Sequence, residues 1–319
     1  MQKTKVLILG ATGFIGRNLI ERLSTREDVE LFGTYLSREP DSRLSNENVI
    51  LSQVDLTNSD QVNRIISGMD VVIQAAAVTT GSKDVVSKPY IHVTDNAVMN
   101  SLILRACFES AVKHMVFFSC TVMYPSQLEA VKEDDVDYQI IDKYFGIGWT
   151  KVYIEKMCEF YSKISDTKFT VIRHSNIYGP HDKYDLERSH VFGATVTKVL
   201  KAQNNEIEVW GDGSETRDLL YISDLVDFVE SIIKLQECPY ELINIGYGHS
   251  IPIKSLIEKI IEVSGKQISM TFDVSKPTIN FNLALNCDKA RAKYGWSPQI
   301  SLEDGIKKTL TWYRQNMTK

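Results

Sequence analysis

A short apolar run that ends in spaced glycines constrains the fold of this chain more than any other feature. The run Val6–Leu9 is followed by Gly10-Ala11-Thr12-Gly13-Phe14-Ile15-Gly16, and helical apolar spacing then continues to Leu23. This order predicts a buried strand, a glycine turn and the start of a helix. Backbone N–H groups at a helix N-terminus attract phosphate, and glycines let the backbone approach it closely. The segment is therefore expected to hold a dinucleotide pyrophosphate, and an ordinary strand–helix turn is the alternative.

Length, charge and cysteine usage limit the class of protein. The 319 residues can form one large α/β domain and a smaller one. A net charge of -5 without a basic cluster argues against nucleic-acid and acidic-membrane partners. Apolar stretches such as 71–78 are too short to span a bilayer, and a strand at the start leaves no room for a signal peptide. Five scattered cysteines without a CxxC pair, and histidines without ligand spacing, predict reduced thiols in the cytoplasm and no metal site.

Strand and helix patterns alternate through the first half of the chain. The predicted strands are 6–9, 29–35, 49–53, 70–75, 115–118 and 169–173, and the predicted helices include 60–67, 94–110 and about 148–164. This alternation predicts an α/β fold with a doubly wound parallel sheet of the Rossmann type. Ligands of such sheets bind beyond the carboxyl ends of the strands, where Gly10, Asp55, Ala75, Ser119 and Arg173 fall.

The alternation weakens after Pro180. Helices are predicted at 190–201, 225–235, 253–264, 287–294 and 302–315, and strands at 207–210, 219–221 and 242–245. We interpret residues 1–175 as a dinucleotide-binding domain, with 219–245 as a segment that returns to it. Residues 176–218 and 246–319 are expected to form a smaller mixed α/β substrate domain.

Motifs spread over nearly the whole chain resemble one enzyme family. They are the Gly10/Gly13/Gly16 spacing, Asp55-Leu56, Ala75-Ala76-Ala77, Asn96, Ser119, Lys151, Asn176–Pro180 and Arg217-Asp218. This set resembles the extended short-chain dehydrogenase/reductase family, also known as the NAD-dependent epimerases/dehydratases. A sharper likeness to the GDP-L-fucose synthase branch comes from Asn176–Asp182, Ser189-His190-Val191, Lys151 with Lys156, Cys158, Glu159 and Tyr161, and Val209-Trp210-Gly211 with Arg217.

The resemblance implies two binding sets. The cofactor set is Gly10, Thr12, Gly13, Phe14, Ile15, Gly16, Arg38, Asp55, Leu56, Ala75, Ala76, Ala77, Lys151 and His174. The substrate set is Asn176, Lys198, Trp210 and Arg217. Within it, Arg217 and Lys198 would neutralise a sugar diphosphate, and Trp210 would pack against the base or ribose. The alternative for either cation is an ordinary surface charge.

The end of the second predicted strand indicates the type of nicotinamide cofactor. NAD enzymes usually place a carboxylate there, whereas NADP enzymes need cations. Here Tyr35 is followed by Ser37 and Arg38, with Arg43 nearby and no carboxylate before Glu39. The sequence therefore favours NADP, with NAD as the alternative.

The catalytic tyrosine of the family is missing from its usual place. The resemblance implies a lysine, Lys151, that holds the nicotinamide ribose and favours a phenolate; a solvated lysine paired with Glu155 is the alternative. Four residues before it, where the family has tyrosine, stands Ile147. Tyr144 precedes Lys151 by seven residues, about 10 Å along a continuous helix. It could carry the proton only if the helix starts late, and simple packing of its ring is the alternative.

A cysteine and a histidine complete the candidate catalytic set. Cys120 occupies the place of the serine or threonine that polarises the sugar oxygen, with Thr121 beside it, while the family's catalytic cysteine aligns with Val122. Cys120 would then also have to act with His190 as acid and base in an epimerisation. A small buried hydrophobe and a hydrogen-bonded histidine at a helix start are the alternatives. The predicted catalytic residues are Lys151, Cys120, Thr121, Tyr144 and His190.

We therefore expect a cytoplasmic, NADP-dependent reductase, or epimerase-reductase, of a nucleotide-activated 4-keto-6-deoxysugar, with GDP as the expected nucleotide. One alternative is an NAD-dependent nucleotide-sugar 4-epimerase or dehydratase. The other is a cofactor-binding protein without turnover, which Ile147 favours. The helices near 94–110 and 149–164 resemble those that build family dimers, so a homodimer is expected.

Overall fold

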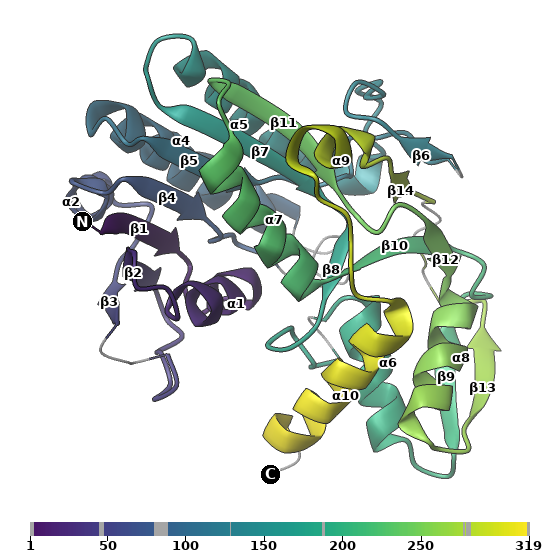
Figure 1. Cartoon of the computed structure of the whole chain (residues 1–319). Helices are drawn as coiled ribbons and strands as arrows, with labels where there is room; N and C mark the ends of the chain where they lie inside the picture. The colour runs from purple at the N-terminus through teal and green to yellow at the C-terminus, as the bar shows by residue number, and fades with distance from the viewer. Residues whose placement is uncertain are drawn as a thin grey trace.

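A parallel sheet organises the larger part of the molecule (Figure 1). The computed structural model describes residues 3–44, 48–79, 89–127, 129–186, 189–276, 278 and 282–317. Its seven-stranded sheet has the order β11-β7-β5-β4-β1-β2-β3, and every pairing in it is parallel. The strands are β1 (Thr4–Leu9), β2 (Val29–Tyr35), β3 (Val49–Gln53), β4 (Val71–Gln74), β5 (His114–Phe118), β7 (Lys168–His174) and β11 (Tyr240–Ile245). The predicted doubly wound α/β fold is confirmed.

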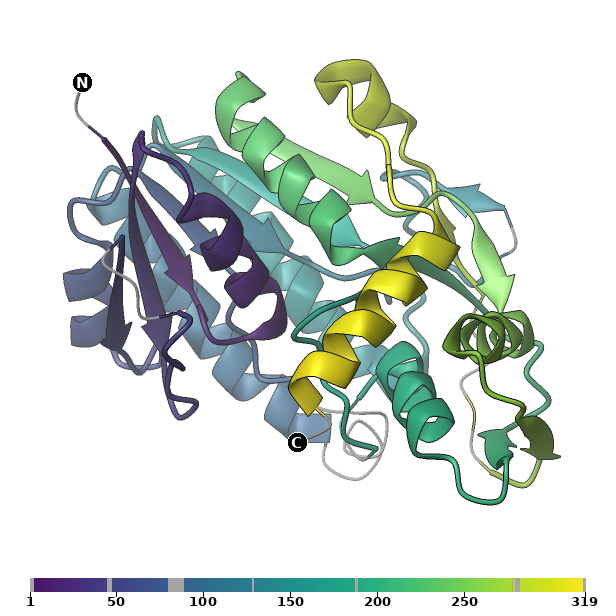
Figure 2. The same ribbon diagram turned by 60° about the horizontal axis from the view of Figure 1, so that its bottom comes forward.

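Helices cover both faces of this sheet, which explains its unbroken apolar strands. Figures 1 and 2 show α1 (Phe14–Leu23) and α7 (Ile222–Leu235) on one face. The other face carries α2 (Ser59–Ile66), α4 (Thr94–Glu109) and α5 (Phe145–Ser162). Along β1, Val6 and Ile8 join the core under the first pair, whereas Leu7 and Leu9 join the core under the second group. The alternation of strand side chains thus builds two apolar cores from one short run.

Short strands and three helices form a second layer beside the sheet (Figure 2), and a further helix, residues 288–294, packs against β11 of the large sheet. One small sheet has the order β12-β10-β8, another pairs β13 with β9, and a third pairs β14 with β6. The strands are β6 (Ala130–Val131), β8 (Asn176–Tyr178), β9 (Glu206–Trp210), β10 (Thr216–Tyr221), β12 (Ser250–Pro252), β13 (Ser269–Asp273) and β14 (Ala284–Leu285). The helices are α6 (Val191–Lys201), α8 (Ile253–Ser264), α9 (Asp288–Tyr294) and α10 (Leu302–Met317), with 3-10 turns at η1 (Pro89–His92) and η2 (Asp142–Tyr144).

The structure departs from the predicted elements in three places. The strands β6, β8, β12, β13 and β14 were not predicted, because each is short and pairs with a segment far away in the sequence. Leu219 belongs to β10 and pairs with Asn176 of β8, rather than with the large sheet. Helix α5 begins at Phe145 and not at Gly148. In the described part of the chain, no helix has the length and apolarity that crossing a bilayer requires.

Candidate active site

The glycine turn between β1 and α1 lies in close contact with neighbouring backbone, at distances that leave no room for side chains. Gly10 has a φ of +82°, and a Cβ on it would lie 2.7 Å from the Cα of Ala76. A Cβ on Gly16 would lie 2.2 Å from the carbonyl oxygen of Gly10, so α1 begins directly against the turn. Gly13 caps α1 without a side chain, and the first turn carries no acidic residue. The N–H groups of Gly10 and Ala11 donate to Thr34 and that of Gly13 donates to Gly10, so a phosphate at this turn would meet the N–H groups of the first turn of α1.

The end of β2 places one cation on the glycine turn. The guanidinium of Arg38 donates to the carbonyl oxygen of Thr12 at 3.3 Å. The guanidinium of Arg43 instead donates to the Asn316 side chain at 2.6 Å, on α10. A nearby carboxylate that the sequence analysis missed, Asp41, is paired with Arg17 at 2.8 Å. Of the two arginines, Arg38 therefore contacts the glycine turn and Arg43 does not.

A chain of side-chain amides holds the loop after β4, where Ala75, Ala76 and Ala77 lie. The amide of Asn96 accepts from the N–H of Val78 and donates to its carbonyl, both at 3.0 Å. The amide of Asn100 donates to the carbonyl oxygen of Asn96 at 2.7 Å and accepts from Gln74 at 3.0 Å. These hydrogen bonds fix the backbone of the loop at the carboxyl edge of the sheet.

The remaining cofactor residues flank these loops. Asp55, after β3, accepts hydrogen bonds from the N–H of Thr57 at 2.9 Å and from its hydroxyl at 2.6 Å. These bonds lower the pKa of Asp55, so its carboxylate is ionised at neutral pH. Leu56 beside it is buried. Phe14 and Ile15 are partly buried against the core under α1.

Lys151 reaches from α5 to the end of β5. Its Nζ donates to the carbonyl oxygen of Phe118 at 2.8 Å and lies 4.6 Å from the centroid of the Phe117 ring. Burial lowers the pKa of Lys151, and the neighbouring Cys120 and Glu155 oppose that shift. Lys151 is therefore a desolvated lysine at the carboxyl edge and not a surface lysine.

Cys120 lies beside that ammonium, two residues beyond the carbonyl that it contacts. Burial raises the pKa of the Cys120 thiol, and the charge of Lys151 acts against this increase. The thiol is thus held protonated at neutral pH next to a cation. The neighbouring Thr121 accepts a backbone hydrogen bond from Tyr124 at 3.1 Å.

Tyr144 lies directly before α5, because the helix begins at Phe145 and not after Gly146 or Gly148. It ends η2, and Ile147 already belongs to the helix. The Tyr144 ring packs with Cys120 against a small buried cluster of Met123, Ile140 and Val152. Burial raises the pKa of Tyr144, and Arg217 opposes that change. The late helix start that would bring this phenol to Lys151 is therefore not formed, and Tyr144 faces Cys120 and Arg217.

Two histidines belong to the predicted site, and His174 lies near Lys151. Nδ1 of His174 lies 2.8 Å from the carbonyl oxygen of Ser175, and burial, with Lys151 and His190, lowers the pKa of His174 to about 4. His190 is the N-cap residue of α6. Desolvation, and then the charge of Lys183, lower the pKa of His190. Both imidazoles are consequently neutral at pH 7.

The residues predicted to bind the substrate belong to the second layer. The amide of Asn176 donates to the carbonyl oxygen of Asp218 at 3.2 Å, and Arg217 donates to that of Thr216 at 2.7 Å. Lys198 donates to the carbonyl oxygen of Glu208 at 2.8 Å. The pairing of β8 with β10 brings Asn176 next to the strand that carries Arg217.

Arg173 was predicted to lie at the carboxyl edge of the sheet, where ligands bind. Its side chain instead lies beneath that edge. Its guanidinium donates to both carboxylate oxygens of Glu155, at 3.0 and 2.6 Å, and to the hydroxyl of Tyr124 at 2.9 Å. The hydroxyl of Ser119 donates to the same carboxylate at 2.5 Å, so Ser119 also faces inward. The alternation of β7 explains this placement: His174 and Arg173 are neighbours and point to opposite faces.

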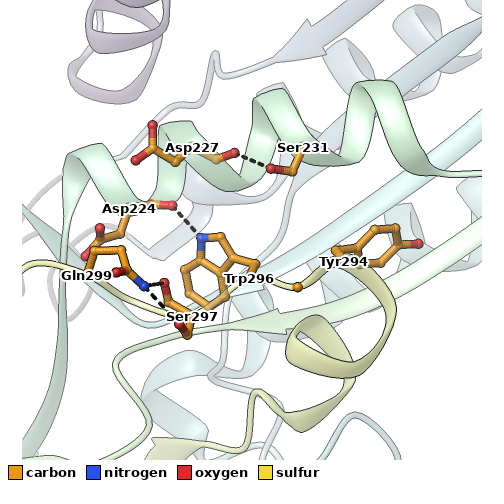
Figure 3. A pocket seen from close by; sticks show the side chains of 8 residues that line it. Asp224, Asp227, Ser231, Tyr294, Trp296, Ser297 and Gln299 are labelled. Carbon is orange, nitrogen blue, oxygen red and sulfur yellow. Dashed lines mark hydrogen bonds between the residues drawn. The ribbon is translucent and has the colours of Figure 1, made fainter.

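Two small cavities lie away from the predicted catalytic residues. One of about 170 Å³ is lined by Asp224, Asp227, Trp296 and their neighbours, between α7 and the segment that follows α9 (Figure 3). Trp296 donates to the carbonyl oxygen of Asp224 there at 3.0 Å. The other, of about 210 Å³, borders the buried Glu155–Arg173 pair from the side of Tyr240. Neither cavity contains a residue of the predicted catalytic set.

Comparisons with known proteins agree with this geometry. The family model of the NAD dependent epimerase/dehydratase family matches residues 6–246. The chain is 29% identical to a GDP-L-fucose synthase of Azorhizobium caulinodans, over 97% of this chain and 96% of that one. It is 25% identical to a dTDP-4-dehydro-6-deoxy-D-allose reductase of Streptomyces bikiniensis, over 98% and 96%. The fold matches a UDP-glucose 4-epimerase from Thermotoga maritima with a TM-score of 0.88 at 22% identity, over 98% of this chain and 100% of that one. The chain therefore belongs to the NAD dependent epimerase/dehydratase family.

Proposed function

We propose that this chain, an NAD(P)-dependent nucleotide-sugar enzyme, uses NADPH to reduce a GDP-linked 4-keto-6-deoxysugar, with or without epimerisation. One observation carries the proposal: Lys151 contacts the carbonyl of Phe118, next to Cys120, at the carboxyl edge of the sheet. Arg217 and Lys198, cations of the second layer, would pair with the sugar diphosphate. The glycine turn supports dinucleotide binding, because Gly16 lets α1 begin directly against the carbonyl of Gly10, which leaves the first N–H groups of the helix to a phosphate.

Each of the candidate catalytic residues has a separate role in the proposed reaction. The bound nicotinamide supplies the hydride for the sugar carbonyl carbon. The Cys120 thiol gives its proton to the carbonyl oxygen, and the ammonium of Lys151 stabilises the resulting thiolate. For epimerisation, His190 and Cys120 serve as base and acid on opposite faces of the ring. Arg38, which follows β2 and contacts the glycine turn, would pair with the 2′-phosphate that distinguishes NADPH from NADH.

Turnover with a defined substrate tests this function. We expect NADPH to be oxidised in the presence of a GDP-linked 4-keto-6-deoxymannose, and NADH to be a poorer reductant. Release of tightly bound NAD from denatured protein, with interconversion of 4-hydroxyl stereochemistry, would instead indicate the 4-epimerase. Cofactor binding with no reaction on any nucleotide sugar would indicate a protein without turnover, and would contradict the proposal.

The proton carrier is tested by two variants of neighbouring residues. Cys120→Ala should lower kcat by about 100-fold or more, because it removes the proton donor beside Lys151. Tyr144→Phe keeps the packing of the ring and should lower kcat less than about tenfold. Steady-state kinetics at saturating NADPH measures both effects. The reverse order of the two losses would make Tyr144 the proton carrier.

An exposed apolar stripe on α5 supports the expected homodimer. Phe145, Trp149, Tyr153 and Phe160 are 58%, 39%, 51% and 55% exposed, and α4 beside them exposes Val98. The spacing of the first three places them on one helix face. A second copy, related by two-fold symmetry, covers such a stripe with the same stripe of its own. Sedimentation equilibrium should give twice the mass of the chain, and Tyr153→Glu should give the monomer; a monomeric wild type would contradict this.

A further inference from the structure

An exposed tryptophan and a carboxylate share one face of β9, at the outer end of the substrate residues. Trp210 is 47% exposed, and its indole Nε1 donates to Oε1 of Glu208 at 3.0 Å. The two residues are separated by one position along the strand, so both side chains lie on the same face. Among the residues that the structure describes, none donates a hydrogen bond to Oε2 of Glu208. The pair thus presents an aromatic ring with an acceptor at its edge.

Two lysines accompany the ring. The Nζ of Lys198, from α6, lies 5.8 Å from the centroid of the indole, and the Nζ of Lys276 lies 6.0 Å from it. Burial lowers the pKa of Lys198, and Glu208 opposes this. Each lysine has a flexible four-carbon stem and can move from the ring to a phosphate. A ring flanked by two such cations suits an aromatic ligand that also carries negative charge.

This platform connects to the catalytic residues at a distance that suits a nucleotide. Lys198 follows His190 by eight residues of α6, which corresponds to about 12 Å along the helix. The turn after Trp210 contacts Thr278, since a Cβ on Gly211 would lie 2.6 Å from Cγ2 of Thr278. The carbonyl oxygen of Thr278 accepts from Lys143, the residue before Tyr144, at 3.1 Å. A sugar at His190 would therefore leave its nucleotide within reach of Lys198 and of the Trp210 ring beside it.

We propose that Glu208 selects guanine as the base that stacks on Trp210, which names the nucleotide of the proposed function and rests on that function. Guanine presents two adjacent N–H donors, at N1 and N2. Glu208 accepts both through Oε2 and through the lone pair that Oε1 keeps beside the indole N–H. Uracil and thymine present one N–H between two carbonyl oxygens, which a carboxylate repels. Hypoxanthine keeps the N1 donor and lacks the N2 amine. Glu208 consequently favours GDP over IDP, and IDP over UDP or dTDP.

Titration calorimetry of the NADPH-bound enzyme with GDP, IDP, UDP and dTDP tests this selection. The wild type should bind GDP about tenfold or more tighter than UDP and dTDP, with IDP between them. Glu208→Gln should weaken GDP about tenfold and change UDP less than about threefold. The matched control is Glu206→Gln: Glu206 lies two residues earlier on the exposed face of β9 and should change neither affinity. Unchanged NADPH binding shows that each variant is folded.

The outcomes separate this inference from the function on which it rests. Equal affinities of the wild type for GDP and UDP would overturn guanine selection. An equal loss of affinity for both nucleotides in Glu208→Gln would also overturn it. Either result would leave the proposed function as a nucleotide-sugar enzyme intact. A loss of GDP binding in Glu206→Gln as large as in Glu208→Gln would also overturn guanine selection. Failure of all four diphosphates to bind to an enzyme that binds NADPH would overturn the proposed function as well.

Discussion

The Lys151→Met variant is expected to lose about a thousandfold in kcat while the protein remains folded. The ammonium of Lys151 is desolvated, contacts the Phe118 carbonyl and faces Cys120, so its charge acts directly on the group that donates the proton. Methionine keeps most of the side-chain volume and removes that charge. Because an unpaired buried charge costs free energy, the thermal midpoint of the variant should be equal to or higher than that of the wild type. Steady-state kinetics and thermal unfolding measure the two effects.

The pH dependence of the wild type gives a second measurement of the same residue. Burial lowers the pKa of Lys151, so the ammonium is lost at a lower pH than it is for a free lysine. Wild-type kcat should therefore fall on the alkaline side below the ordinary lysine pKa of about 10.4, and Lys151→Met should lack that limb. Lys156→Met is the matched control, because Lys156 lies on the same helix, exposed and paired with Glu159. Equal losses in both variants would contradict a specific role of Lys151.

Arg173→Met is expected to destabilise the fold by about 3–5 kcal/mol, the largest effect on stability that we expect. The side chains of Arg173 and Glu155 are each 4% exposed, and the variant leaves the carboxylate of Glu155 buried without its cation. Burial by itself lowers the pKa of Arg173, but the hydrogen bonds and charge of Glu155 outweigh it and raise the pKa above its ordinary value. Urea unfolding at pH 7 measures the loss.

Two further variants define the cause of that loss. Adding Glu155→Leu to Arg173→Met should recover most of the stability, since no unpaired charge then remains inside. Arg22→Met breaks ion pairs with Asp227 and Glu230; Arg22 itself is 51% exposed and Glu230 keeps Arg26 as a partner, so the variant should cost less than about 1 kcal/mol. If Arg173→Met costs no more than Arg22→Met, the buried pair does not contribute as proposed.

The sequence predicts the large sheet well and the second layer less completely. The first strands are short apolar runs between helical patterns, and local periodicity is enough to find them. The strand β13 was missed because Ser269–Asp273 is half exposed and is held by pairing with β9, more than 60 residues away. Such a strand depends on tertiary contacts that no local pattern contains.

In the candidate site, too, the features with a local sequence signal were predicted and those that depend on tertiary contacts were missed. The glycine turn was predicted from local spacing, and Lys151 was predicted from the family resemblance. The pairing of Arg173 with Glu155 was missed, because the position of Arg173 at a strand end does not tell which face its side chain occupies. Glu155 was considered only as a partner of Lys151 one helical turn away. The side chain of Arg173 points inward because side chains alternate along β7. Glu155 lies on the face of α5 that packs against β7, so the two side chains meet.

The amide network around Asn96 also has a consequence for ligand association. Its hydrogen bonds hold both the N–H and the carbonyl of Val78, and Gln74 and Asn100 extend them to the base of the loop. Residues 75–78 thus meet a coenzyme in a preorganised shape, and little conformational entropy remains to be lost there on association.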